Sequence, residues 1–291
     1  VRRLLPRAGQ QQVTPDWAER MAQHHLTCTV QADGALLPLL EIKTLGRSEI
    51  YQQGKKILDC SELGSLSRQL LILLLMAPNH RLGLDHLLGL LWPESSSTRA
   101  RASFDSNFSR LRKTLDAALL CGSIRDYLVL ERGVLILRNI CADCQQFDDS
   151  VKKGQLHLRR QELWQAGLAF RTANHFWQGT FLAGQDLPDE LFVEQQRLTE
   201  LRLDMVESWS DLLLRDDAGE EAAALLQEGI RLEPTREPLV RRLYGYHSGR
   251  RKSVQAKKIL EFYYQALLAD DYSAADASEI VQALECDARQ F

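Results

Sequence analysis

The stretch STRARASFDSNFSRLRKTLDAAL, from Ser97 to Leu119, decides the fold of the N-terminal half of this chain. Apolar residues recur in it at steps of three or four: Ala100, Phe104, Phe108, Leu111, Leu115 and Leu119. This spacing predicts an amphipathic helix with one face in a core. The other face presents Arg99, Ser106, Ser109, Arg110 and Lys113, with Arg101 and Arg112 at its edge. Cations and small hydroxyls without bulky groups suit a helix that enters a DNA major groove.

The segments on either side of this helix predict a helix-turn-helix with a wing. Before it, residues 66–76 and 84–92 read as two helices, the second stopped by Pro93. After it, residues 127–130 and 134–137 are rich in β-forming residues and read as a hairpin. Arg132 lies near the tip of this predicted wing.

The N-terminal segment predicts a short helix and a small antiparallel sheet. Thr14 and Pro15 resemble an N-cap and first turn, so residues 15–25 are expected to be helical. Short strands are expected in LTCTVQ, LLEIKTLG and EIYQQGKKIL, between residues 26 and 58. Gln53 and Gly54 supply a tight hairpin turn within the last of them.

Composition describes a soluble globular chain of two domains with an uneven charge. Residues 1–145 hold 18 Lys/Arg and 14 Asp/Glu, a net charge of +4, whereas residues 146–291 hold 18 and 25, a net of −7. Only the first half therefore favours a polyanion as partner. The six cysteines fit no disulfide ladder, no secretory signal precedes them, and no apolar run is long enough for a bilayer, so we expect a cytoplasmic protein with no membrane partner. Because the chain opens with Val1, we expect a piece of a longer polypeptide.

The second half predicts stacked helical pairs. Ala222 and Leu226 recur 34 residues later as Ala256 and Leu260, which is the tetratricopeptide (TPR) period. Helices are expected at about 156–175, 187–215, 218–232, 235–247, 252–269 and 273–286. Such pairs leave a concave surface for a partner. The turn residues Arg250, Arg251 and Lys252 are expected to be solvated.

These residues resemble a known family. LGR near residue 45, the leucine-rich run within 66–76, LWPE at 91–94 and SRLRKTL at 109–115 look like the winged helix of bacterial antibiotic regulatory proteins, the SARP group. Response-regulator output domains share this fold and its N-terminal sheet. From Phe147 through FLAGQDLPDELFVEQQRL to the C-terminus, the chain is similar to the bacterial transcriptional activator domain that follows the winged helix in this family.

The resemblance implies roles for individual residues. The arginine that opens the RLRK-like motif reaches base edges in the family, so Arg110 is expected to read bases, with guanine as its natural partner. The position three before it, Asn107, also contacts DNA in the family, although the helical wheel places it beside the apolar stripe. Ser109, Arg112, Lys113, Arg99 and Arg101 would hold phosphates, and Arg132 would approach the minor groove or backbone. The alternative is a solvated face with Arg112 paired to Asp116, and Asp105 would repel phosphate unless Arg101 or Arg112 paired with it.

Other candidate sites favour structural explanations. Cys141 and Cys144 form a CxxC without the second ligand pair that zinc needs, so we expect two small buried residues. Trp164, Phe170, Phe176 and Trp177 are expected to pack in a core. No phosphate-binding loop or nucleophile motif occurs, so the sequence predicts no catalytic site, cofactor or metal.

The sequence as a whole predicts a mainly α fold with small β elements. Its expected parts are an N-terminal segment (1–25), which could belong to an upstream region, a winged-helix DNA-binding domain (26–145) and a TPR-like activator domain (146–291). The expected function is transcription regulation, with double-stranded DNA as partner, a homodimer as the assembly, and RNA polymerase and a small-molecule effector or upstream domain as further candidates. The alternative is a protein-interaction scaffold whose winged helix no longer binds DNA.

Overall fold

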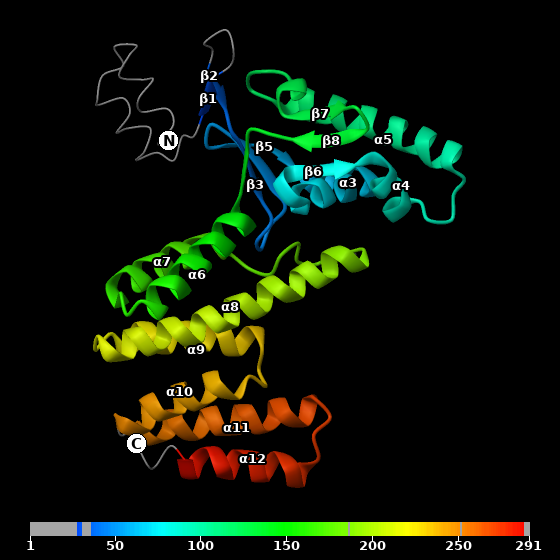
Figure 1. Cartoon of the computed structure of the whole chain (residues 1–291). Coiled ribbons are helices and arrows are strands. Elements are labelled where there is room, and N and C mark those ends of the chain that lie inside the picture. Colours follow the sequence, from blue (N-terminus) through cyan, green and yellow to red (C-terminus); the bar gives the residue numbers. More distant parts are fainter. Residues whose placement is uncertain (1–27, 31–35, 186, 251, 288–291) are drawn as a thin grey trace, which may run out of the picture. The chain divides into compact units, whose positions relative to one another are not determined.

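The computed structural model describes residues 28–30, 36–185, 187–250 and 252–287. They fall into two compact units, one made of the chain up to Gln146 with Phe176–Gln195, the other of Phe147–His175 with the chain from Gln196 onward (Figure 1). The sequence had placed residues 176–195 with the second half, whereas their contacts place them with the first unit. The predicted helix at 15–25 lies outside the described residues.

The first unit begins with two small sheets. Strands β1 (Cys28–Val30) and β2 (Leu36–Pro38) pair antiparallel. A four-stranded sheet has the order β5-β4-β3-β9, with β3 (Leu40–Lys43), β4 (Glu49–Gln52), β5 (Lys55–Asp59) and β9 (Ile140–Ala142). Gln53 and Gly54 connect β4 to β5 with φ of 54° and 73°, the left-handed pair that a two-residue hairpin turn requires. The predicted hairpin is confirmed.

Three helices follow the sheet, in the predicted order. They are α3 (Ser65–Met76), α4 (Leu84–Leu91) and α5 (Ser97–Ala118). Helix α3 is buried over most of its surface because Leu70–Leu75 are all apolar and inaccessible. Helix α5 packs on both α3 and α4 through the predicted stripe, of which Phe104 and Leu111 are fully buried. Its last predicted member, Leu119, instead caps the helix in extended conformation.

A three-stranded sheet completes the winged helix. Strand β6 (Arg81–Gly83), between α3 and α4, pairs antiparallel with β8 (Val134–Leu137), which pairs with β7 (Leu128–Glu131). The predicted wing is therefore present, and β6 anchors it to the helices. The sequence had not indicated β6 because three residues are too few to show a period of two.

Two long-range connections in this unit were also not predicted. Strand β9 pairs parallel with β3, about one hundred residues earlier in the chain. Asp143, directly after β9, accepts hydrogen bonds from the backbone N–H groups of Thr44 and Leu45 at 2.8 and 3.1 Å. Leu45 also forms a bridge with Phe181, so the segment 176–195 packs at the end of β3.

The rest of the chain is helical: α6 (Asp143–Arg159), α7 (Leu163–Phe176), α8 (Asp189–Arg215), α9 (Gly219–Leu232), α10 (Glu237–Gly249), α11 (Ser253–Ala269) and α12 (Ala274–Asp287). The single helix expected at 156–175 is wrong. The chain breaks between α6 and α7, where Gln161 has a φ of 60°. Gly154 lets the two helices approach closely, since an added Cβ would overlap the ring of Phe170.

The TPR-like stacking in the second unit is confirmed by the packing of its later helices. Helix α10 packs on α9 and α11, and α11 packs on α12. Ala222 and Ala256, which define the 34-residue period, are both buried at these contacts. Small side chains at this position let neighbouring helices pack closely.

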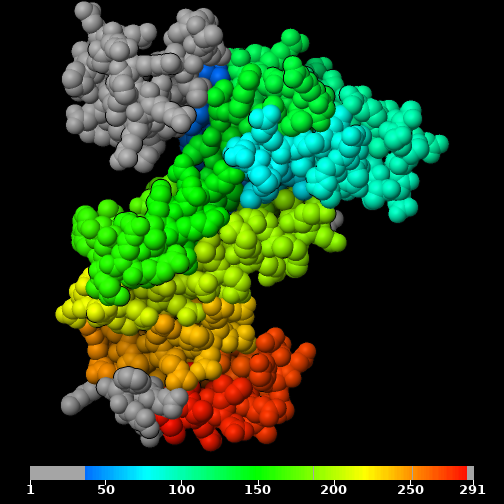
Figure 2. All heavy atoms as spheres, viewed as in Figure 1, coloured from blue at the N-terminus to red at the C-terminus, as the bar shows by residue number. Residues whose placement is uncertain are grey.

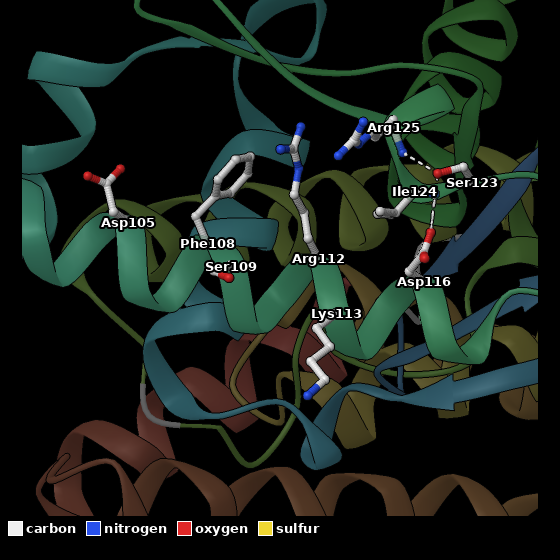
Figure 3. A pocket seen from close by; sticks show the side chains of 9 residues that line it. All are labelled: Asp105, Phe108, Ser109, Arg112, Lys113, Asp116, Ser123, Ile124 and Arg125. Carbon is white, nitrogen blue, oxygen red and sulfur yellow. Dashed lines mark hydrogen bonds between the residues drawn. The ribbon is translucent and has the colours of Figure 1, made fainter.

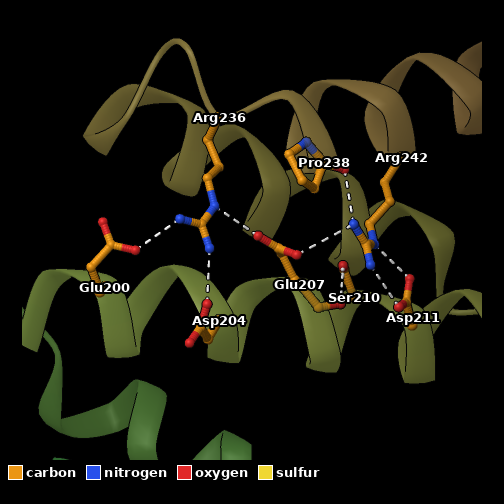
Figure 4. Close-up of polar contacts among 8 residues, drawn as sticks. All are labelled: Glu200, Asp204, Glu207, Ser210, Asp211, Arg236, Pro238 and Arg242. Carbon is orange, nitrogen blue, oxygen red and sulfur yellow. Dashed lines mark hydrogen bonds and ion pairs between the residues drawn. The ribbon is translucent and has the colours of Figure 1, made fainter. Parts of the chain in front are cut away.

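Ion pairs connect α8 to the segment that begins α10 (Figure 4). The guanidinium of Arg236 donates to Glu200, Asp204 and Glu207, each at 2.8–2.9 Å. Arg242, one turn into α10, pairs with Asp211 at 2.7 Å. Networks of this kind hold orientation better than isolated surface pairs, because each arginine is shared among fixed carboxylates.

Two expectations for this unit need correction. Phe170 is fully buried, but Trp164 is 75% exposed, so it does not belong to a common aromatic core. Arg250 is exposed and Lys252 is half-buried, and neither is merely solvated, because they pair with Asp217 at 3.3 Å and Glu220 at 2.9 Å. Arg251 lies outside the described residues. Among the described residues, no helix combines the length and apolarity needed to cross a membrane.

Candidate nucleic-acid interface

The outward face of α5 is open to solvent, as its amphipathic pattern requires. Figure 2 shows part of this helix at the molecular surface, in the blue-green of residues near 100. The exposed residues include all but two of the predicted contacts on the helix: Arg99, Arg101, Ser106, Ser109, Arg110 and Lys113. Arg99, Arg110 and Lys113 make no ion pair within the described part of the chain. The helix therefore presents unneutralised positive charge.

Asp105 is the only carboxylate between Arg99 and Lys113, and it is paired. The Nε of Arg101 lies 3.2 Å from both of its carboxylate oxygens. From the sequence, Asp105 was expected to repel phosphate unless it paired with Arg101 or Arg112, and it pairs with Arg101. Both side chains are about half exposed, so the pair is weak and a phosphate could compete for the guanidinium.

Arg112 is anchored by a backbone carbonyl and an aromatic ring. Its Nη2 donates to the carbonyl of Leu128 at 2.8 Å, and its guanidinium lies 4.4 Å from the ring centre of Phe108. Burial, with the nearby charge of Arg125, lowers its pKa. The alternative pairing of Arg112 with Asp116 is wrong, because Asp116 accepts instead from the backbone N–H of Ile124 at 2.7 Å.

Asn107 is half-buried, as the helical wheel had indicated. Its Nδ2 donates to the carbonyl of Ser103 at 2.8 Å, one turn back along the helix. Its own carbonyl accepts from the hydroxyl of Ser67 on α3. Asn107 therefore lies at the edge of the face and not at its centre.

Arg132 occupies the tip of the wing. It adopts a φ of 49° and is followed by Gly133 at 77°, so the two residues form the tight turn between β7 and β8. The side chain is exposed. A cation at this position extends beyond the sheet and can reach a groove or backbone next to the one that α5 enters.

A pocket opens beside the C-terminal half of α5, and the sequence had not indicated it. Its lining comes from α5 and from the short 3-10 helix η3 (Ile124–Asp126) (Figure 3). Arg125 on η3 is the cation that sequence reasoning missed. In the sequence, Arg125 is a single arginine in the loop between the helix and the wing. No periodic pattern marks it as part of a site.

Burial disfavours the reactive thiolate form of both cysteines in the CxxC motif. It raises the pKa of Cys144 to about 12 and also raises the pKa of Cys141, and the thiolate is the form that metal binding and redox chemistry need. Cys144 is buried, as predicted, whereas Cys141 is only half-buried. Within the described ranges, no group of three or more His, Cys, Asp or Glu side chains could hold a metal ion.

Comparison with known proteins identifies the second half. Residues 142–279 match the family described as bacterial transcriptional activator domain. The chain has the SARP-type architecture. In it, a winged helix precedes the activator domain, and the match begins in β9, at the end of the winged helix.

The chain is also similar to two known bacterial proteins. The regulatory protein AfsR of Streptomyces coelicolor is 31% identical over 221 residues, which are 75% of this chain but only 21% of AfsR. The chain thus spans about a fifth of the length of this SARP-type relative. The structure of Mycobacterium tuberculosis EmbR, solved with a low-affinity phosphopeptide, superposes with a TM-score of 0.63 over 86% of this chain and 65% of that chain. At 24% identity, EmbR shows a shared fold.

Proposed function

We propose that this chain is a sequence-specific DNA-binding transcriptional regulator that acts as an activator. Helix α5 enters the major groove, where Arg110 reads base edges and forms a bidentate pair with guanine. The observation that supports this most directly is the exposed face of α5, on which Arg110 and Lys113 make no ion pair within the described residues. The wing beside the helix supplies Arg132 for the backbone or minor groove.

The remaining residues of the face position the helix without reading sequence. Arg99, Lys113 and the hydroxyls of Ser106 and Ser109 are exposed and can hold phosphates. Arg101 does so by exchanging Asp105 for a phosphate, and Arg112 does so from its anchored position. Asn107 contributes at the edge of the contact.

The activator domain supplies the contacts that convert binding into regulation. We propose that it supports a homodimer, contacts RNA polymerase, or responds to a small-molecule effector or an upstream domain, in the cytoplasm. The match to the bacterial transcriptional activator domain and the similarity to the regulatory protein AfsR support a regulatory and non-enzymatic role. The net charge of only +4 on residues 1–145 favours weak binding by one copy and stronger binding by a dimer on tandem half-sites.

The test begins by sequencing fragments that co-purify with the chain from sheared genomic DNA. Binding to a recovered fragment is then measured by fluorescence anisotropy at several salt concentrations. Affinity should fall steeply with salt. Arg110→Ala should cost about 1–3 kcal/mol on the recovered site and little on random DNA, because it removes a base contact. Arg110→Ala with Lys113→Ala should weaken binding to both.

Arg159→Ala is the matched control, since Arg159 is equally exposed but lies on α6, outside this face. It should leave affinity and salt dependence unchanged. If the double variant binds as the unmodified chain does, α5 is not the DNA-reading element. A chain that recovers no DNA but captures proteins would instead be the scaffold that is the alternative function.

A further inference from the structure

The pocket beside α5 contains more positive charge than its carboxylates neutralise. It has a volume of about 360 Å³, at the small end of ligand sites, which span roughly 300–1,000 Å³. Asp105, Phe108, Ser109, Arg112, Lys113, Asp116, Ser123, Ile124 and Arg125 line it (Figure 3). Figure 3 shows Arg112 and Arg125 extending toward one another on the same side of the helix, while Lys113 points away from them.

Arg112 is held in position before any ligand arrives. Its Nη2 is fixed on the carbonyl of Leu128, and its guanidinium lies over the ring of Phe108. Its Nε is buried and has no hydrogen-bond partner among the described residues. A buried guanidinium N–H without an acceptor costs free energy that an incoming anion would recover.

Arg125 brings a second guanidinium to the same place. The backbone of Arg125 is held on both sides, because its N–H donates to the hydroxyl of Ser123 and its carbonyl accepts from Arg138. The two cations are near enough for Arg125 to lower the pKa of Arg112 by repulsion. In the described part of the chain, Arg125 has no carboxylate within ion-pair distance.

The two carboxylates in the pocket are directed to other partners. Asp116 accepts from the N–H of Ile124 at 2.7 Å and from the hydroxyl of Ser123 at 3.3 Å, which fixes it to the start of η3. Asp105 pairs with Arg101 outside the pocket lining. Two adjacent guanidinium groups therefore lack a direct counter-charge, an arrangement that a bound anion stabilises.

We propose that Arg112 and Arg125 form a binding site for a single phosphate group. Paired guanidinium groups suit phosphate because their planar N–H groups meet its oxygens in pairs. The hydroxyls of Ser109 and Ser123 in the lining can add hydrogen bonds. The phosphate can come from a DNA backbone or from a small phosphorylated molecule. In the first case the site extends the proposed DNA interface and rests on it, and in the second it is independent.

The first arm of the test uses inorganic phosphate and pyrophosphate with the full chain, by calorimetry at constant ionic strength against chloride. Binding should be saturable. Arg125→Gln should weaken it at least about tenfold, and Arg110→Gln, which alters an exposed arginine of α5 outside the pocket, should not. Arg125 is the residue to change because replacing Arg112 also removes the bond to Leu128.

The second arm uses the DNA fragment recovered as described above. If the site holds a backbone phosphate, Arg125→Gln weakens specific and random DNA by the same factor and lowers the salt slope by about one, unlike Arg110→Ala, which erodes sequence preference. Weaker binding by Arg125→Gln in either arm supports the site. Weaker DNA binding assigns the phosphate to the DNA backbone, and weaker binding of free phosphate alone assigns it to a small phosphorylated molecule. No effect in both arms overturns it. A chain that binds phosphate through Arg125 but no DNA would keep this site and refute the proposed function.

Discussion

At the scale of single residues, His247 shows how burial determines a response to pH. It is 7% exposed near the end of α10, and its Nδ1 has no hydrogen-bond partner among the described residues. Burial lowers its pKa, repulsion from Lys252 lowers it further, and Glu220 opposes both. The folded chain therefore resists protonation of this ring more than the unfolded chain does.

The sign of the resulting pH dependence follows from this lowered pKa. As the pH falls below about 6.5, the unfolded chain binds the proton first, so the free energy of unfolding of the second unit should fall. In His247→Leu this loss should be smaller. Urea unfolding at pH 7.5 and 5.5, followed by helix circular dichroism, measures the difference. His86→Gln changes an exposed histidine and should keep the full pH dependence. Equal dependence in His247→Leu would contradict this explanation.

At the scale of elements, a glycine contact joins β3 to the segment 176–195. Gly46 follows β3 with a φ of 77° and donates its N–H to the carbonyl of Thr180 at 3.0 Å. A Cβ at Gly46 would overlap the backbone of Gln178 and Gly179, neither of which can rotate away. Only glycine fits both the backbone angle and the contact.

Gly46→Ala should therefore destabilise the first unit by about 2–4 kcal/mol, because backbone strain and overlap add. Gly54→Ala provides the control. It has a similar φ of 73° but no neighbouring atom within 4 Å, so only the strain of about 1 kcal/mol remains. Thermal unfolding of both variants measures the difference between their losses of stability. Equal losses would mean that the contact with residues 178–179 does not contribute.

At the scale of the whole molecule, the chain leaves the first unit in α6 and returns to it at residue 176. Phe181 and Leu182 from this returning segment are fully buried, and Leu182 donates its N–H to Thr44 at 2.8 Å. Part of the core of the winged-helix unit thus comes from residues that match the activator domain family.

Phe181→Ala should consequently lower the stability of the first unit by about 3–5 kcal/mol, the usual cost of truncating a buried phenylalanine. Amide hydrogen exchange should show lost protection in α3 and β3 and much less loss in α9–α11. Phe170→Ala removes an equally buried ring in the second unit and should give the reverse pattern. Loss of protection confined to the second unit in Phe181→Ala would contradict the assignment of this segment.

Much of the fold could be predicted because its signals are local. The stripe of α5, the Gln53–Gly54 turn and the 34-residue spacing of Ala222 and Ala256 each follow from backbone geometry that a few neighbouring residues express. The exposed face of the candidate interface followed from the same stripe, since one buried face leaves the other outside. The predicted helix boundaries were less accurate where no glycine or proline marks the end of a helix. The break between α6 and α7 at Gln161 is an example.

The sequence by itself determined the order of the elements, the amphipathic helix and the two-part architecture, because these depend on residue spacing along the chain. Only the tertiary structure decided that β9 joins β3, that residues 176–195 complete the first unit, and that Arg112 and Arg125 meet at one pocket. These are contacts between residues far apart in sequence or on different elements. Their geometry depends on how preformed elements pack, and no local period records it.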